Sequence, residues 1–255
     1  MGGIAVMPLG QSGFRFEFGM TVVYIDPYLS DHVAEVDGPE LRRLVPAERD
    51  PAKISDADWV LSTHIHLDHA DPETLIPMSE ASPACRFLCP NEVAEFLADS
   101  GLAAERITIA RKRRYDLGPG LRVRPVPAAH TAIEYDTQGC LRFAGYVFEY
   151  EGRRVYHAGD TSPDDELLAE LERLAPIDIA FLPVNERNYY RDRRGIVGNM
   201  TVREAFQMAE DIGAKTLVPM HWDMFAPNRV YPEEIETLYR LVHPPFELAI
   251  NPERI

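Results

Sequence analysis

The stretch "STHIHLDHAD", residues 62–71, places three histidines and two aspartates within ten positions. It directly follows the apolar run "WVL" (residues 59–61), which has the pattern of a short buried strand. Imidazole and carboxylate groups are costly to bury unless each of them has a hydrogen-bond or metal partner. The density of these groups at the end of a strand therefore predicts a metal site in the loop.

The pattern His64-x-His66-x-Asp68-His69 is the most specific signal in the chain. In an extended segment the side chains of His64 and His66 project to the same side, because side chains alternate along the backbone. A turn after them directs Asp68 and His69 toward a second pocket. We therefore expect this loop to contribute ligands to two neighbouring metal positions.

The remaining ligands are expected at the ends of other strands. The strand patterns "VPAAH", "VYHAGD" and "LVPMH" end on His130, Asp160 and His221. Loops that begin at strand ends are where catalytic groups tend to lie. The sequence thus predicts seven metal ligands from four strand ends, namely His64, His66, Asp68, His69, His130, Asp160 and His221.

The predicted ligand set contains nitrogen and oxygen atoms and no cysteine sulfur. Such a set suits zinc, manganese or iron; we expect two divalent ions, Zn²⁺ or Mn²⁺ first, with iron also compatible. Two ions about 3.5–4 Å apart hold a bridging hydroxide and polarise the carbonyl or phosphoryl oxygen under attack. The predicted chemistry is hydrolysis.

The rest of the chain has the pattern of two β-rich halves with helices outside. Strands are predicted for "IAVMPL", "FRFEF" and "TVVYID", and a hairpin for "LRFAGYVFEY" with "RRVYHAGD". Helices are predicted from a cap at Asn91 to Gly101, over residues 163–174, and after the capping box Thr201-x-x-Glu204. We expect one α/β (α+β) domain over residues 1–255, a four-layer αββα sandwich with halves of roughly 1–135 and 136–255.

These motifs, in this order, resemble those of the metallo-β-lactamase superfamily, and the resemblance covers nearly the whole chain. It implies a duplicated ββα unit folded as αββα. By position it implies that His64, His66 and His130 hold a first metal ion. It likewise implies that Asp68, His69 and His221 hold a second ion, with Asp160 bridging the two.

Finer likeness is to one branch of that superfamily. "YIDPYLS", "VYHAGDTSPDDELLAEL" and "GNMTVREAFQMAEDIGAKTLVPMHWDMF" are similar to ascorbate-6-phosphate lactonase-like proteins. This implies a lactonase in which metal-bound hydroxide opens a cyclic ester, such as a phosphorylated sugar-type lactone. Asp68 or Asp160 is the predicted catalytic group that passes a proton to the departing alkoxide.

Two other functions remain open from the sequence. A phosphodiesterase acting on a small cyclic or nucleotide phosphoester would direct the same hydroxide at phosphorus. A non-catalytic scaffold of the same fold is disfavoured, because every expected ligand is present.

Two further residues are predicted to lie just behind the ligands. Asp26 ends a strand before Pro27, where its carboxylate can fix the tautomer of a metal-bound histidine or simply cap a turn. His157 lies three residues before Asp160 and is expected either beside the site or as a core histidine.

The loop "NERNYYRDRRG", residues 185–195, concentrates arginines in an acidic protein. Arginine binds phosphate or carboxylate through two parallel hydrogen bonds. We therefore expect this loop either to hold an anionic group of a small substrate or to be a solvated surface. The arginines concerned are Arg187, Arg191, Arg193 and Arg194.

Composition limits the partners. Over 255 residues the formal charge is 26 − 41 = −15, which argues against nucleic acid and anionic membrane as partners. No stretch reaches the ~20 apolar residues of a membrane span, and no secretory signal is visible, so a cytoplasmic location is expected. The cysteines Cys85, Cys89 and Cys140 are expected to be reduced structural thiols. Resemblance to the lactonase-like branch further implies a homo-oligomer.

Overall fold

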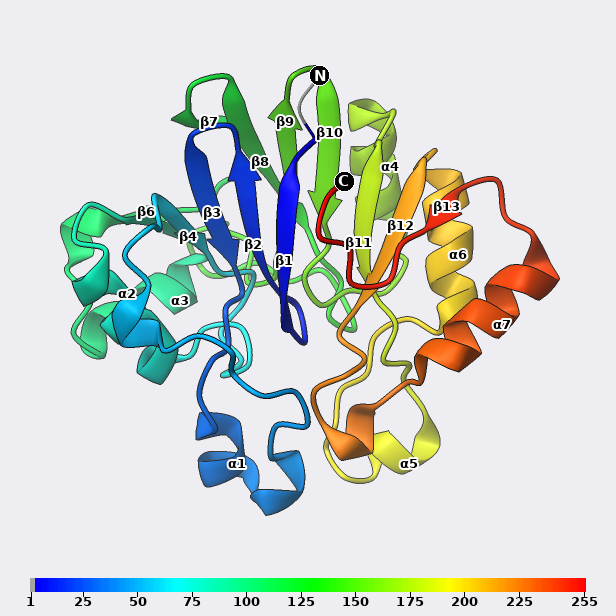
Figure 1. Cartoon of the computed structure of the whole chain (residues 1–255), viewed down its shortest axis with the longest axis horizontal. Coiled ribbons are helices and arrows are strands. Elements are labelled where there is room, and N and C mark those ends of the chain that lie inside the picture. Colours follow the sequence, from blue (N-terminus) through cyan, green and yellow to red (C-terminus); the bar gives the residue numbers. More distant parts are fainter. Residues whose placement is uncertain (1–2) are drawn as a thin grey trace.

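The computed structural model describes residues 3–255 and contains two mixed sheets that pack face to face (Figure 1). In the first sheet the strands follow the order β1-β2-β3-β4-β5-β6, antiparallel from β1 to β3 and parallel from β3 to β6. Their bounds are β1 (Ala5–Gly10), β2 (Gly13–Phe18), β3 (Thr21–Ile25), β4 (Trp59–Leu61), β5 (Arg86–Cys89) and β6 (Ile107–Ile109).

The second sheet has the order β13-β12-β11-β10-β9-β8-β7. Its bounds are β7 (Tyr115–Gly118), β8 (Leu121–Pro127), β9 (Ala144–Tyr150), β10 (Arg153–His157), β11 (Ile179–Pro183), β12 (Thr216–Met220) and β13 (Glu247–Leu248). The predicted hairpin is confirmed as β9 and β10. The first sheet ends at Ile109 and the second begins at Tyr115. The second sheet thus begins before residue 135, the expected end of the first half, because β7 pairs with β8 and β8 pairs with β9.

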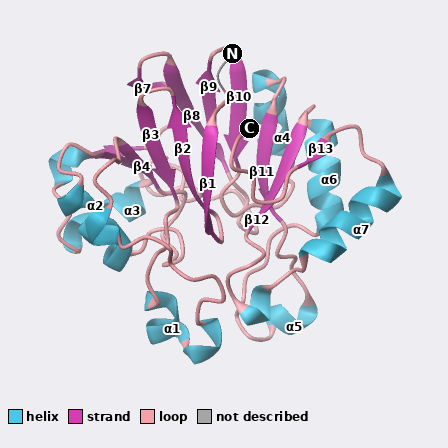
Figure 2. Cartoon of the chain, in the orientation of Figure 1, coloured by secondary structure: helices cyan, strands magenta, loops and turns pink. Residues whose placement is uncertain are grey.

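Helices cover the outer face of each sheet, which confirms the predicted αββα order (Figures 1 and 2). The first sheet carries α2 (Pro72–Ala81) and α3 (Asn91–Asp99), and the second carries α4 (Asp165–Leu174), α6 (Val202–Asp211) and α7 (Pro232–Val242). The short helices α1 (His32–Asp37) and α5 (Tyr189–Asp192) lie at the lower end in Figure 1. Single 3₁₀ turns are η1 (Pro39–Leu41), η2 (Pro51–Lys53), η3 (Ala104–Arg106) and η4 (Ala226–Asn228).

Aromatic side chains fill the space between the sheets. The alternation in β2 turns Phe14, Phe16 and Phe18 to one face, where all three are buried. The ring centroid of Phe14 lies 4.8 Å from that of Phe181, and Phe18 lies 5.3 Å from Phe148. These edge-on and stacked contacts join the two sheets into one core.

The capping box at Thr201 and Glu204 is confirmed. The cap predicted at Asn91 is wrong, because Pro90 occupies the N-cap position of α3. Asn91 lies inside the helix, where its side-chain amide donates to Glu95 instead of capping the helix start.

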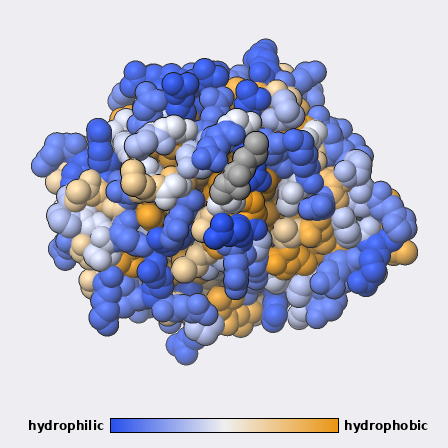
Figure 3. Space-filling model, turned by 45° about the horizontal axis from the view of Figure 1, so that its top comes forward, coloured by the Kyte–Doolittle hydropathy of each residue, from blue (hydrophilic) through white to orange (hydrophobic). Residues whose placement is uncertain are grey.

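Polar side chains dominate the surface toward the end that carries the N-terminus, with small apolar patches between them (Figure 3). Among residues 3–255, every helix is too short or too polar to span a bilayer. Cys85, Cys89 and Cys140 are buried free thiols, as predicted.

Candidate metal centre

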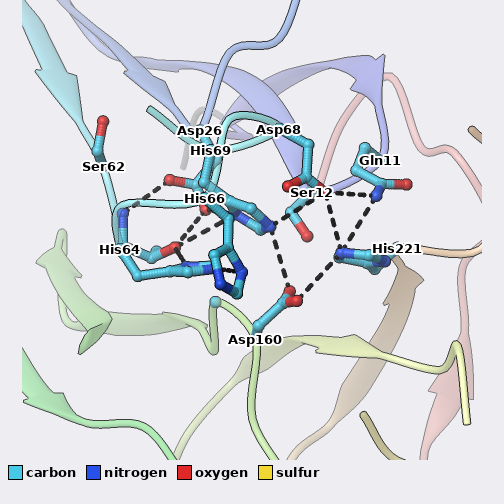
Figure 4. Close-up of polar contacts among 12 residues, drawn as sticks. Gln11, Ser12, Asp26, Ser62, His64, His66, Asp68, His69, Asp160 and His221 are labelled. Carbon is cyan, nitrogen blue, oxygen red and sulfur yellow. Dashed lines mark hydrogen bonds and ion pairs between the residues drawn. The ribbon is translucent and has the colours of Figure 1, made fainter. Parts of the chain in front are cut away.

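The seven predicted ligands meet in one cluster. Figure 4 labels all of them except His130. The loop after β4 contributes four ligands from the first sheet, and the ends of β8, β10 and β12 contribute three from the second. Their ligand atoms form three groups, each within 4.8 Å. These groups are His64, His66 and His130; His64, His69 and Asp160; and Asp68, His69 and His221.

A tight turn within the loop of residues 62–71 makes its ligand side chains point in two different directions. The backbone N–H groups of His69 and Ala70 both donate to the carbonyl of His66. This turn separates His64 and His66 from Asp68 and His69, as the spacing predicts. The loop ends at Asp71, whose carboxylate caps α2 and also accepts hydrogen bonds from Ser30 and Thr74. Asp71 therefore anchors the loop rather than joining the cluster.

Asp160 lies between the histidines predicted for the first ion (His64, His66 and His130) and those predicted for the second (His69 and His221). Its Oδ2 is 3.1 Å from His221 Nε2 and 3.9 Å from His130 Nε2, and its Oδ1 is 3.4 Å from His69 Nε2. Asp68 Oδ2 lies 3.5 Å from His69 Nε2. A carboxylate in this position is placed to bridge two ions.

Several polar atoms of this cluster are buried without a hydrogen-bond partner among residues 3–255. They are His69 Nε2, both ring nitrogens of His130, Asp160 Oδ1 and His221 Nδ1. Leaving buried polar atoms unpaired costs about 1–3 kcal/mol each. Most of these atoms point into the cluster as nitrogen and oxygen donors of the kind that divalent ions take, so the residues fit a metal centre.

The charges of the cluster are strongly coupled. Burial lowers the pKa of His221, but Asp160 and Asp68 outweigh it and raise that pKa to about 9. The same carboxylates, with Asp26, raise the pKa of His69 well above its usual value although burial opposes this. In Asp68 and Asp160 burial raises the pKa, but the histidines hold it well below its usual range. The two carboxylates thus favour positive charge at His69 and His221.

The pKa values of His64 and His130 shift in the opposite direction, downward. Burial lowers the pKa of His64 well below its usual value. Burial, opposed by Asp160, also lowers the pKa of His130 to about 4. These two imidazoles are neutral near pH 7, and a neutral imidazole is the form that binds a metal.

Asp26 lies directly behind His69, where it was predicted to lie behind a ligand. Its fully buried carboxylate accepts a hydrogen bond from His69 Nδ1 at 2.8 Å and two more from the N–H and Oγ1 of Thr63. The contact leaves the proton on Nδ1 and directs Nε2 of His69 toward the cluster.

Gln11 also touches the cluster, although the sequence did not single it out. It lies in the turn between β1 and β2 with φ of 58°, held by Asp223, which accepts from its N–H, and by His221, whose N–H donates to its carbonyl. Its side-chain Nε2 donates to Asp68 Oδ2 at 2.7 Å and lies 3.1 Å from His221 Nε2. The motif "GQSG" indicates a turn, and nothing in that pattern indicates where the amide points.

His157 is placed differently from the other predicted neighbours of the ligands. Its Nε2 donates to the backbone carbonyl of Ser12, its Nδ1 accepts from the N–H of Gly159, and its ring stacks on Phe181. His157 is thus a core histidine that braces the turn next to Gln11, and its hydrogen bonds go to backbone rather than to a ligand imidazole.

The predicted arginine loop is only partly directed at the site. The guanidinium of Arg191 donates to three backbone carbonyls, those of Glu186, Pro227 and Arg229, so it holds the loop together and is not free to hold an anion. Arg193 donates to the hydroxyl of Tyr189, and Arg187 is exposed. Arg194 alone of these four arginines lines the cavity of about 870 Å³ over the cluster.

Comparisons with known proteins agree with this centre. A model of the beta-lactamase superfamily domain matches residues 21–222. A UPF0173 metal-dependent hydrolase of Bacillus velezensis is 30% identical over 224 residues, 85% of this chain and 84% of that protein. Another, of Pyrococcus abyssi, is 28% identical over 242 residues, 92% of each chain.

Solved structures share the fold. Igni18, a metallo hydrolase from Ignicoccus hospitalis, matches with a TM-score of 0.73 at 19% identity, over 100% of this chain and 98% of that one. An isothiocyanate hydrolase from Delia radicum gut bacteria matches with a TM-score of 0.73 at 17% identity, over 98% and 97%. The chain belongs to the beta-lactamase superfamily and, within it, to the UPF0173 family of metal-dependent hydrolases.

Proposed function

We propose that the protein opens a cyclic ester, a lactone, with two divalent ions, Zn²⁺ or Mn²⁺, held by the seven clustered side chains. The observation that carries this proposal is the position of Asp160 between two histidine groups at the base of one large cavity. When bound, such ions activate water and polarise the carbonyl of the ester.

The candidate ligands would be divided between the two ions as follows. His64, His66 and His130 would hold the first ion, and Asp68, His69 and His221 the second, with Asp160 shared. Asp26 keeps the proton of His69 on Nδ1, away from the cluster. Asp26 thus fixes the orientation of the His69 imidazole before an ion binds.

Asp68 is the proposed proton carrier. Its contacts with Gln11, His69 and His221 all involve Oδ2, and Asp68 also lines the cavity. We infer that Oδ1 is the oxygen that takes a proton from the attacking water and delivers it to the departing alkoxide. Gln11 keeps the carboxylate oriented for this by its hydrogen bond to Oδ2.

The charge of the cavity supports a carbonyl ester over a phosphodiester. Outside the candidate ligands, the carboxylates of Asp37 and Glu40 line the cavity, together with the guanidinium of Arg194. A phosphodiester carries a negative charge that these carboxylates repel, whereas a lactone is neutral. This also argues against the anionic substrate that the arginine loop suggested.

A substrate screen tests the proposal. Metal-loaded protein is expected to hydrolyse γ- and δ-lactones, and metal-depleted protein is not. Asp160→Asn, which keeps the shape of the side chain, is expected to lose at least 100-fold in kcat. Hydrolysis of bis-p-nitrophenyl phosphate or cyclic nucleotides, with lactones left intact, would instead show the phosphodiesterase.

A further inference from the structure

We propose that the substrate carries an uncharged, apolar substituent on its ester ring, bound in the part of the cavity farthest from the candidate ligands. This rests on the proposed function, because it assumes that the ester carbonyl reaches the metal centre. The substituent is expected to lie between the α1–η1 segment and the loop of residues 194–197, both of which line the cavity. In Figure 1, α1 and α5 lie on either side of the lower end.

Apolar side chains line much of this region, beside the carboxylates of Asp37 and Glu40. Val33 and Leu41 line it from the α1–η1 segment, Ile196 and Val197 from the opposite loop, and Leu67 and Phe225 from beside the cluster. Val197 is 41% exposed and Phe225 is 4% exposed, so the wall extends from the protein surface inward. The same cavity is lined by the ligands His66, Asp68, Asp160 and His221. A single small molecule can therefore touch both parts.

This apolar wall is separate from the main core. Tyr28, Val33, Met224 and Phe225 form their own buried cluster, with Leu41, Val45 and Leu67 packed against it. The cluster supports one side of the cavity, which gives an apolar substituent a preformed surface to cover. Removing apolar area from water is favourable in proportion to that area.

The charges nearby disfavour an anionic substituent. Asp37 and Glu40 both line the cavity, and Arg194 is its cation. Arg191, the half-buried arginine of the loop, is engaged with three carbonyl oxygens. These carboxylates would repel a phosphate or carboxylate placed against the α1–η1 segment, whereas an alkyl or aryl group carries no charge for them to repel.

Kinetics with a substrate series test the inference. The probes are γ-butyrolactones without a substituent and with butyl or octyl chains, together with 6-phosphogluconolactone. For the metal-loaded enzyme kcat/KM is expected to rise roughly threefold per methylene until the chain fills the cavity. A flat profile, or a phosphorylated lactone preferred over the octyl lactone, would overturn the inference.

Two variants and one control locate the effect. Leu41→Asn and Val197→Asn are expected to lower kcat/KM for the octyl lactone roughly tenfold and to leave the unsubstituted lactone unchanged. Val36→Asn is the control, because Val36 lies on α1 with 60% exposure and is not one of the residues that line the cavity. Val197 is largely exposed, so its replacement keeps the test valid even if Leu41→Asn unfolds. A loss of the same size in Val36→Asn would count against the cavity as its cause.

Binding of the matching lactams separates this inference from the proposed function. Calorimetry with alkyl-substituted γ-lactams, which resist hydrolysis, is expected to show affinity that increases with chain length in the wild type and not in Val197→Asn. If lactams bind in this way while no lactone is hydrolysed, the lactonase proposal fails and the apolar site stands. If lactones are hydrolysed but lactam binding ignores chain length, the apolar site fails and the lactonase proposal stands.

Discussion

The side-chain amide of Gln11 donates a hydrogen bond of 2.7 Å to Oδ2 of Asp68, which lies 57 residues later in the chain. The turn between β1 and β2 thus reaches the metal centre from outside the segment that the superfamily model matches, residues 21–222. Gln11 holds Oδ2 of Asp68, a residue that also lines the cavity.

Replacing Gln11 is therefore expected to weaken metal binding at the predicted second position, that of Asp68, His69 and His221. Gln11→Ala should weaken metal affinity there by about 10–100-fold, because Asp68 loses the group that orients it. Competition with a chelating dye measures this affinity. Gln207→Ala is the control, because Gln207 is an exposed glutamine that bonds Asp211 on α6. Equal affinities in Gln11→Ala and wild type would remove Gln11 from the centre.

Asp26→Asn is expected to reduce metal affinity to a similar degree. An asparagine has one acceptor oxygen and cannot satisfy Thr63 and His69 together, so the ring of His69 loses its fixed tautomer. Asp56→Asn makes a matched control: Asp56 accepts hydrogen bonds from Tyr24 and Arg15, not from a candidate ligand. That control should lower stability while metal affinity stays at the wild-type value.

Arg191→Ala should destabilise the protein by about 2 kcal/mol, because three backbone carbonyls lose a charged donor. Urea unfolding of the metal-free protein measures this difference. Arg193→Ala should change stability by less than about 0.5 kcal/mol, since Arg193 is exposed. If Arg191→Ala instead raised KM for an anionic substrate at unchanged stability, the arginine would be a substrate-binding group after all.

Loading the metal-free protein at pH 7 is expected to release protons. Asp160 and Asp68 raise the pKa of His221 to about 9 against the effect of burial, so its ring carries a proton that the metal must displace. The apparent affinity should therefore rise with pH up to about 9 and then level off. Calorimetry in two buffers of different ionisation enthalpy counts the protons. Binding without proton release at pH 7 would contradict this charge state.

Native Cys85 and Cys89 should resist thiol reagents at pH 8. Burial raises the pKa of each thiol to about 12, so little of the reactive thiolate is present, and the reagent has no access. A coloured thiol reagent should react with all three cysteines only after unfolding. Fast labelling of the native protein would show that α2 and α3 open readily from the first sheet.

The metal centre was predictable because its chemistry leaves a pattern in the sequence. His64, His66, Asp68 and His69 are unusual side chains at close spacing, and each distant ligand follows an apolar run. The turn at Gln11 and the contacts of Arg191 had no such signal, since an amide or a guanidinium can serve many partners. Only the folded structure shows that the Gln11 amide donates to Asp68 and that the Arg191 guanidinium donates to three backbone carbonyls.

Secondary structure was missed where proline interrupts the usual signals. The sequence patterns indicated no helix at α2 or α7, which contain Pro72, Pro77 and Pro232. Proline is tolerated in the first turn, where the missing N–H has no partner in the helix anyway, and Pro72 and Pro232 occupy that turn. The short parallel strand β5 was also missed, because its four residues lack alternation and are recognised only beside β4.

The candidate ligands are shared between the two sheets, with the His64–His69 loop on one and His130, Asp160 and His221 on the other. During synthesis the loop leaves the ribosome long before His221 does. A nascent chain that meets a cation early can offer it only part of a coordination shell, and full occupancy has to wait until both sheets have docked. Complete coordination of an ion by these residues would therefore require both sheets to be in place.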